Sequence, residues 1–221
     1  LVIDFGSTCA KPVILDRNGK VVAWSVGRAG SVSGAGLRDS LADAFKHAGI
    51  SHADIARTVS TGYGRRMIDV ADQSYTEITC HARGAVHMCP EARLVIDIGG
   101  QDSKVIAVDA NGLVSQFAMN DRCAAGTGKF LETLARAVEV PIEEMGQLAL
   151  TADEALKISS MCATFAETEV IGLLAEGKKK PEVLGAVHAS IAQRTVGLVA
   201  RVGKRAPVIM TGGVAKNAAA V

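Results

Sequence analysis

Short apolar runs separated by turn residues recur in both halves of the chain. They cover residues 1–3, 12–15 and 21–26 in the first half, and 94–96, 105–108 and 113–118 in the second. A glycine-containing turn follows the first run of each set, and an Asn-Gly pair follows the second. Because both residues of such a pair tolerate positive φ, Asn-Gly is the strongest short-range signal for a β-hairpin. The pattern predicts a three-stranded unit that occurs twice.

The two sets are copies of one sequence. Six residues are identical at a constant offset of 93 positions: Asp4/Asp97, Gly6/Gly99, Lys11/Lys104, Asp16/Asp109, Asn18/Asn111 and Gly19/Gly112. Four of these pairs are turn-forming residues. Their shared spacing indicates an internal duplication.

Elsewhere, apolar residues recur at helical spacing. This periodicity predicts helices over residues 37–48, 77–88, 128–138, 165–176 and 182–202, with further strands over 55–61 and 207–210. Gly49 and Gly177 suit helix C-termini, and Pro181 suits the first turn of the last helix. Strands and helices in two duplicated halves predict a two-lobed α/β fold, with a first lobe over residues 1–92 and a second over 93–221.

The glycine turns carry the candidate chemistry. Asp4 and Asp97 end the first strand of each copy, where a carboxylate can hold Mg²⁺, mainly through water. The glycines let backbone amides approach a ligand closely, and the lysines neutralise phosphate charge. The residues expected to hold phosphates are Gly6, Ser7, Thr8 and Lys11 in the first turn, and Gly99, Gly100, Asp102, Ser103 and Lys104 in the second. Two such turns facing each other across a cleft would clamp a polyphosphate.

Either copy taken alone is equally consistent with a simple tight turn after a buried strand. We favour the ligand interpretation because both turns retain an Asp, a Gly and a Lys. In the second turn, Gln101 is the candidate for orienting the attacking water, and a phosphate contact is its alternative role. A third glycine turn, Thr211-Gly212-Gly213, follows the last apolar strand, and we expect it to open a helix whose N-terminus holds phosphate or nucleoside.

Composition narrows the class of protein. The 221 residues carry a formal net charge of +1, with 48% hydrophobic and 21% charged residues. These values predict a soluble globular protein and argue against a nucleic-acid binder, because no excess of cationic residues is present to displace counterions from phosphates. No run approaches the 18 or so apolar residues of a membrane span. We expect a cytoplasmic protein with reduced thiols, and the missing initiator Met and the end at Val221 favour a fragment.

Four longer stretches contain motifs that include or flank the glycine turns and the cysteines. They are residues 97–104 (DIGGQDSK), 119–131 (MNDRCAAGTGKFL), 160–171 (SMCATFAETEVI) and 211–217 (TGGVAKN). The three glycine turns resemble the two phosphate motifs and the adenosine motif of the acetate and sugar kinase/Hsp70/actin superfamily, which implies its ribonuclease H-like fold. Together, the stretches resemble the ATPases that activate 2-hydroxyacyl-CoA dehydratases, a family shared with the ATPase subunits of benzoyl-CoA reductase (BadF/BadG/BcrA/BcrD type). The resemblance covers nearly the whole chain.

The resemblance implies an iron–sulfur protein that binds ATP and Mg²⁺. One [4Fe–4S] cluster per dimer would be held by two cysteines from each subunit, at the positions of Cys123 and Cys162. Both precede helical patterns, whose N-termini stabilise thiolates. Cys9, Cys80 and Cys89 are expected to be packing residues.

The implied function is ATP-driven electron transfer. Reduced ferredoxin or flavodoxin would load the cluster of a homodimer or paralogue dimer, and ATP hydrolysis would drive one low-potential electron to a 2-hydroxyacyl-CoA dehydratase or, alternatively, to a benzoyl-CoA reductase. The alternative of another class is a small-molecule kinase with Asp102 or Asp121 as its base, but it leaves the cysteine motifs without a role. A nucleotide switch without redox chemistry ranks last, because the chain shows no substrate-binding extension.

Overall fold

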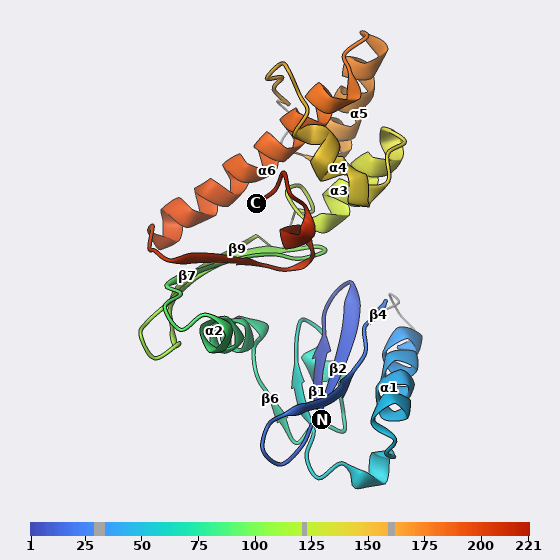
Figure 1. Cartoon of the computed structure of the whole chain (residues 1–221), viewed down its shortest axis with the longest axis vertical. Coiled ribbons are helices and arrows are strands. Elements are labelled where there is room, and N and C mark those ends of the chain that lie inside the picture. Colours follow the sequence, from blue (N-terminus) through green and yellow to red (C-terminus); the bar gives the residue numbers. More distant parts are fainter. Residues whose placement is uncertain (29–33, 121–122, 159–161) are drawn as a thin grey trace. The chain divides into compact units, whose positions relative to one another are not determined.

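The computed structural model describes residues 1–28, 34–120, 123–158 and 162–221. The chain divides into two compact units, Leu1–Gly84 and Ala85–Val221. Each contains one β-sheet, coloured blue to cyan in the first unit and green to red in the second (Figure 1). The expected lobes follow the duplicated strands, whereas the compact units divide within helix α2 (Glu77–Met88).

Unit 1 is built around a six-stranded sheet. Its strands are β1 (Val2–Phe5), β2 (Cys9–Leu15), β3 (Val21–Trp24), β4 (Gly27–Arg28), β5 (Val59–Thr61) and β6 (Gln73–Ser74). The order is β3-β2-β1-β5-β6, with β4 on β2; β1 to β3 are antiparallel, and β5 and β6 continue the sheet in parallel. Helix α1 (Ala35–Ala48) packs on β2 and β3, and its Leu37 and Leu41 contact the buried cluster around Ile3 and Phe5.

Unit 2 has the same sheet frame with more helices. Its strands are β7 (Leu94–Ile98), β8 (Ser103–Val108), β9 (Val114–Asn120) and β10 (Val208–Thr211), in the order β10-β7-β8-β9. Its further helices are α3 (Gly128–Ala137), α4 (Ile142–Ala149), α5 (Ala163–Ala175) and α6 (Lys180–Val202). Strand β10 runs parallel to β7, whereas β7, β8 and β9 are antiparallel.

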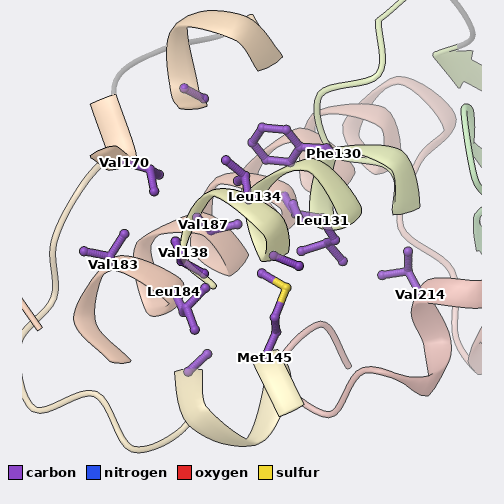
Figure 2. Packing of buried hydrophobic residues seen from close by; sticks show 14 of the residues in the cluster. Phe130, Leu131, Leu134, Val138, Met145, Val170, Val183, Leu184, Val187 and Val214 are labelled. Carbon is purple, nitrogen blue, oxygen red and sulfur yellow. The ribbon is translucent and has the colours of Figure 1, made fainter. Parts of the chain in front are cut away.

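Within its described residues, unit 2 has two buried hydrophobic clusters, and the larger one lies mainly among its helices. Phe130, Leu131 and Leu134 on α3 meet Met145 on α4 and a row of valine and leucine residues on α5 and α6 (Figure 2). The spacing of the α3 residues places them on one helix face, as the periodicity predicts. Burying these side chains is the main stabilising contribution that holds the helices together.

Helix α6 spans both cores of unit 2. Its length and apolar composition alone would suffice to cross a membrane. However, Val183, Leu184 and Val187 pack in the helical core, and Leu198, Val199 and Val202 pack on the sheet. These contacts explain the apolar composition of α6 by its packing inside unit 2.

Most predicted elements are confirmed, but two need correction, and the short strands β4 and β6 are not among the predicted strands. The strand predicted over residues 55–61 covers only 59–61, and residues 55–58 form an irregular segment between a 3₁₀ turn and the strand. The helix expected after the third glycine turn is a four-residue 3₁₀ turn, Gly213–Lys216. Helix α4 is not among the predicted helices. Gly49 and Gly177 both adopt positive φ at helix ends, as expected, and Pro181 lies in the first turn of α6.

The internal duplication is confirmed in detail. Asp4 pairs with Lys11 across β1 and β2, and Asp97 pairs with Lys104 across β7 and β8. The following hairpins match as well. The backbone N–H of Asp16 donates to Lys20 and that of Asp109 to Leu113, both at 2.9 Å, and both second strands carry an irregularity just before the hairpin.

The duplication also extends to a strand outside the repeated stretch. Thr61 lies opposite Asp4 in the parallel β1–β5 pair, and Thr211 lies opposite Asp97 in the parallel β7–β10 pair. A glycine with positive φ follows each threonine: Gly62 at +90° and Gly212 at +85°. The match escapes a fixed-offset comparison because the connection before β10 is longer than the one before β5.

Candidate functional site

The second phosphate turn is tight and carries two carboxylates. Its backbone closes through a hydrogen bond from the Gly99 N–H to the Asp102 carbonyl at 2.9 Å. A Cβ at Gly99 would lie 2.6 Å from Asp102 Oδ1, so any side chain here would displace the Asp102 carboxylate. Lys104 Nζ lies 2.6 Å from Asp102 Oδ2 and 3.4 Å from Asp97 Oδ2.

Lys104 organises this pair of carboxylates. Its side chain is only 4% exposed. Burial lowers the pKa of Lys104, but the hydrogen bond with Asp102 and the charges of Asp97 and Asp102 outweigh burial, so the net shift is upward. Lys104 therefore stays charged, and the cluster of two carboxylates and one ammonium has a net negative charge. Such a charge suits a divalent cation.

The first phosphate turn has the same backbone and a different charge. The Gly6 N–H donates to the Cys9 carbonyl at 3.0 Å, and Lys11 Nζ lies 2.7 Å from Asp4 Oδ2. Cys9 occupies the position equivalent to Asp102, so this turn has one carboxylate and one ammonium. The Lys11 side chain is 44% exposed, in contrast to buried Lys104. The first turn is thus neutral, and its lysine is accessible to a ligand.

The predicted hydroxyl and amide groups lie in different surroundings. Ser7 and Gln101 are exposed on their turns. Thr8 Oγ1 is buried and has no hydrogen-bond partner among the described residues. Ser103 Oγ instead donates to the Gly126 carbonyl at 3.2 Å, within the loop that follows Cys123. The Ser103 hydroxyl thus holds the cysteine loop.

The third glycine turn packs against the second phosphate turn. A Cβ at Gly212 would clash with the Ile98 carbonyl and lie 2.8 Å from Asp97 Oδ1. Thr211 Oγ1 donates to the same Asp97 oxygen at 3.1 Å. Space around Gly213 is open, so a ligand could approach its backbone. The short 3₁₀ turn replaces the helix N-terminus that the sequence predicts here.

Cys123 and Cys162 line one pocket of unit 2, about 510 Å³ in volume. Cys123 comes from the loop after β9, and Cys162 is the N-cap residue of α5. Arg194 and Arg201 of α6 line the same pocket. The two motifs, far apart in the sequence, are therefore brought together at a cationic surface.

The expected position at a helix start holds for only one of the two cysteines. Cys162 directly precedes α5, whereas Thr127 is the N-cap of α3 and Cys123 lies earlier in the loop. The backbone N–H groups of Thr164 and Phe165 lower the pKa of Cys162, and the Arg194 guanidinium contributes a smaller attraction. Cys162 is therefore biased toward the thiolate form that binds metals.

The lowered pKa of Cys162 gives a pH-dependent expectation. Because the thiolate is the nucleophile, iodoacetamide should alkylate Cys162 of the iron-free protein with a midpoint pH below that of a free cysteine. Peptide mass spectrometry across a pH series measures this midpoint. Arg194→Gln should move it upward by a small amount, since the backbone remains the main cause. A midpoint at or above that of free cysteine would contradict the assignment.

The second phosphate turn is joined directly to the cysteine loop and α3. The N–H groups of Gly128 and Lys129 donate to the Gly99 and Gly100 carbonyls, both at 2.8 Å. With the Ser103 bond, these contacts join the candidate nucleotide and metal-binding segments.

The donor set of one chain fits half of an iron–sulfur cluster. A [4Fe–4S] cluster takes four thiolates. Within the described residues, no group of three or more His, Cys, Asp or Glu side chains could hold a metal ion. Cys9, Cys80 and Cys89 are half-buried free thiols. Asp121, an alternative kinase base, lies outside the described residues, as do parts of both cysteine motifs.

Some residues of the site escape prediction from the sequence. No sequence motif marks Arg194, which lies on α6. The fold brings its side chain next to Gly126 and into the lining of the cysteine pocket. From the sequence, Thr61 is placed at the end of a predicted strand, directly before Gly62, and neither residue is assigned a function. A search for Thr-Gly pairs after both parallel strands would have found them.

Three relatives resemble this chain over most of their length. The activator of lactoyl-CoA dehydratase from Anaerotignum propionicum is 47% identical, covering 100% of this chain and 85% of the relative. One of the subunits of benzoyl-CoA reductase from Thauera aromatica is 34% identical, covering 96% and 77%. The solved activator of 2-hydroxyisocaproyl-CoA dehydratase from Clostridium difficile, with bound ADPNP, is 42% identical with a TM-score of 0.92, covering 99% and 81%.

More distant structures share the fold alone. Two sugar-kinase structures at 14% and 15% identity have TM-scores of 0.53 and 0.55. The two-lobed fold of the acetate and sugar kinase/Hsp70/actin superfamily is thereby confirmed. A family model matches residues 1–221. The chain belongs to the BadF/BadG/BcrA/BcrD ATPase family.

Proposed function

We propose that this chain is an ATP-hydrolysing activator that delivers low-potential electrons to a 2-hydroxyacyl-CoA dehydratase. The observation that carries the proposal is the pocket shared by Cys123 and Cys162, joined by Ser103 to the second phosphate turn. The 47% identity to a lactoyl-CoA dehydratase activator supports the substrate class of the partner. The lower identity to a component of benzoyl-CoA reductase makes that role the alternative.

Both duplicated turns contribute to Mg-ATP binding in this proposal. Asp97 and Asp102 hold Mg²⁺ through water, and buried Lys104 keeps both carboxylates in place. In the first turn, exposed Lys11 neutralises phosphate charge, and Asp4 helps to position Mg²⁺. Gln101 orients the attacking water, while Gly212 and Gly213 accommodate the nucleoside.

Two chains together supply the four thiolates of one [4Fe–4S] cluster, which, when bound, provides the one-electron carrier. Cys123 and Cys162 of each chain hold it, and Arg194 offsets part of the thiolate charge. We infer a homodimer, or a dimer with a paralogue, that receives electrons from ferredoxin or flavodoxin. In a reducing cytoplasm the cysteines stay as free thiols that can bind iron.

Phosphoryl transfer to a small molecule is less compatible with the site. Asp102, one candidate base, accepts a hydrogen bond from Lys104 at 2.6 Å, so this carboxylate oxygen is already occupied by an ion pair. A kinase also gives the paired cysteines no chemical role.

The proposal is tested by reconstitution under anaerobic conditions. The protein, a reductant, Mg²⁺ and ATP are added to a purified 2-hydroxyacyl-CoA dehydratase, and formation of the unsaturated acyl-CoA is measured. We expect activation with ATP and none with ADPNP. ATP hydrolysis without dehydratase activation, together with support of benzoyl-CoA reduction, would favour the reductase role. An iron-free protein that phosphorylates a small molecule would overturn the proposal.

A further inference from the structure

The two Thr-Gly pairs at the ends of β5 and β10 occupy equivalent places beside the two aspartates. Thr61 and Thr211 share one register against Asp4 and Asp97. A Cβ at Gly62 would lie 2.5 Å from Asp4 Oδ1 and 2.6 Å from the Phe5 carbonyl. The backbone after Thr61 therefore presses against the Asp4 carboxylate, as the backbone after Thr211 presses against Asp97.

The hydroxyl groups of the two threonines differ in their bonding. Thr211 Oγ1 donates to Asp97 Oδ1 at 3.1 Å, while Lys104 holds the other oxygen of that carboxylate. Thr61 is 6% exposed, and its Oγ1 has no hydrogen-bond partner among the described residues. Buried polar groups in folded proteins are nearly always paired, so an unpaired one calls for a reason.

The surroundings of Thr61 are held in place rather than loose. Arg65 Nη1 donates to the Gly62 carbonyl at 3.0 Å and to Glu77 Oε2 at 2.9 Å. The Gly64 N–H donates to the Phe5 carbonyl at 2.7 Å. The turn after Thr61 is thus held on β1 by hydrogen bonds. The Thr61 hydroxyl therefore has a fixed position from which it can donate to an acceptor.

Movement of Lys11 would free an acceptor for the Thr61 hydroxyl, namely the Asp4 carboxylate. Lys11 occupies Asp4 Oδ2 at 2.7 Å, and its exposed side chain can exchange the carboxylate for a phosphate. Asp4 Oδ2 then loses its ammonium partner, and the carboxylate can accept a hydrogen bond from another donor. We propose that Thr61 is a positioning residue of the first phosphate turn, whose hydroxyl donates to the Asp4 carboxylate once Lys11 binds a nucleotide phosphate. The inference rests on the proposed function.

Substitution of Thr61 tests this role by nucleotide affinity. Thr61→Val keeps the shape of the side chain and removes the hydroxyl; Thr61→Ser keeps the hydroxyl. Isothermal titration with Mg-ATP should give a Kd for Thr61→Val on the order of tenfold weaker than wild type, since a hydrogen bond to a charged group is lost. Thr61→Ser should bind within about twofold of wild type.

Ser60→Ala is the matched control. Ser60 is fully buried on the same strand, its Oγ also lacks a partner among the described residues, and it points to the opposite face. It should bind Mg-ATP like wild type. Without nucleotide, Thr61→Val should melt no lower than wild type, because its hydroxyl has no bond to lose.

Three outcomes would overturn the inference. Wild-type affinity in Thr61→Val removes the role of the hydroxyl. A lower melting temperature of nucleotide-free Thr61→Val, with weak binding that Thr61→Ser also shows, indicates a packing role only. A wild-type protein that fails to bind Mg-ATP overturns the proposed function together with this inference, and so is distinguishable from the first two.

Discussion

Cys162→Ala is expected to yield a protein without iron. A cluster shared by two chains loses two of its four thiolates when one cysteine is removed, because the substitution is present in both subunits. Iron and sulfide analysis after anaerobic purification should fall from about four irons per dimer to background. The absorption that dithionite bleaches and all dehydratase activation should be lost with it. Cys123→Ala should behave in the same way.

Cys89→Ala provides the control for these variants. Cys89 is a half-buried free thiol of the same unit, just after α2, and does not line the cysteine pocket. It should retain iron and activation. Nucleotide binding should persist in all three variants, since the phosphate turns keep their hydrogen bonds. Iron and activation retained in Cys123→Ala or Cys162→Ala would remove that cysteine from the proposed ligand set.

Asp97→Asn is expected to lower Mg²⁺-dependent ATP hydrolysis by roughly a hundredfold or more. The substitution keeps the size of the side chain and removes one of two negative charges that offset Lys104. Lys104 keeps its 2.6 Å bond to Asp102, so the turn should stay folded. Phosphate release at saturating ATP measures the loss, and the iron content should match wild type.

Asp109→Asn serves as the control for Asp97→Asn. Asp109 also belongs to the duplicated sequence, but its carboxylate accepts backbone hydrogen bonds from Asn111 and Leu113 in the hairpin turn. Its replacement should cost some stability and leave the rate of ATP hydrolysis unchanged. If Asp97→Asn hydrolysed ATP at the wild-type rate, the second turn would not be the magnesium site.

Local signals make the frame of the fold predictable. The Asp, Gly and Lys residues of each turn are close in sequence, so a constant offset reveals both copies from the sequence alone. Asn-Gly pairs, helix-ending Gly49 and Gly177, and the periodic apolar residues of α3 likewise act within a few residues of themselves. The structure confirms the elements that these signals predict.

The features that the sequence leaves open depend on contacts between distant segments. Ser103 resembles a phosphate ligand because it follows the turn, but the fold turns its hydroxyl to Gly126. Arg194 joins the cysteine pocket from α6, and nothing near it in the sequence marks that role. Thr61 matches Thr211 only after both strands are paired in parallel with their partners.

The two copies differ chiefly in one connection. Among the described residues, the connection between β3 and β5 in unit 1 contains strand β4, helix α1 and a 3₁₀ turn. The connection between β9 and β10 in unit 2 contains helices α3, α4, α5 and α6 and both candidate cluster cysteines. The candidate cluster cysteines thus lie in the longer of two equivalent connections of a duplicated unit. A duplicated unit of this kind can gain a new site by lengthening one connection, because the paired strands that carry its two glycine turns keep their register.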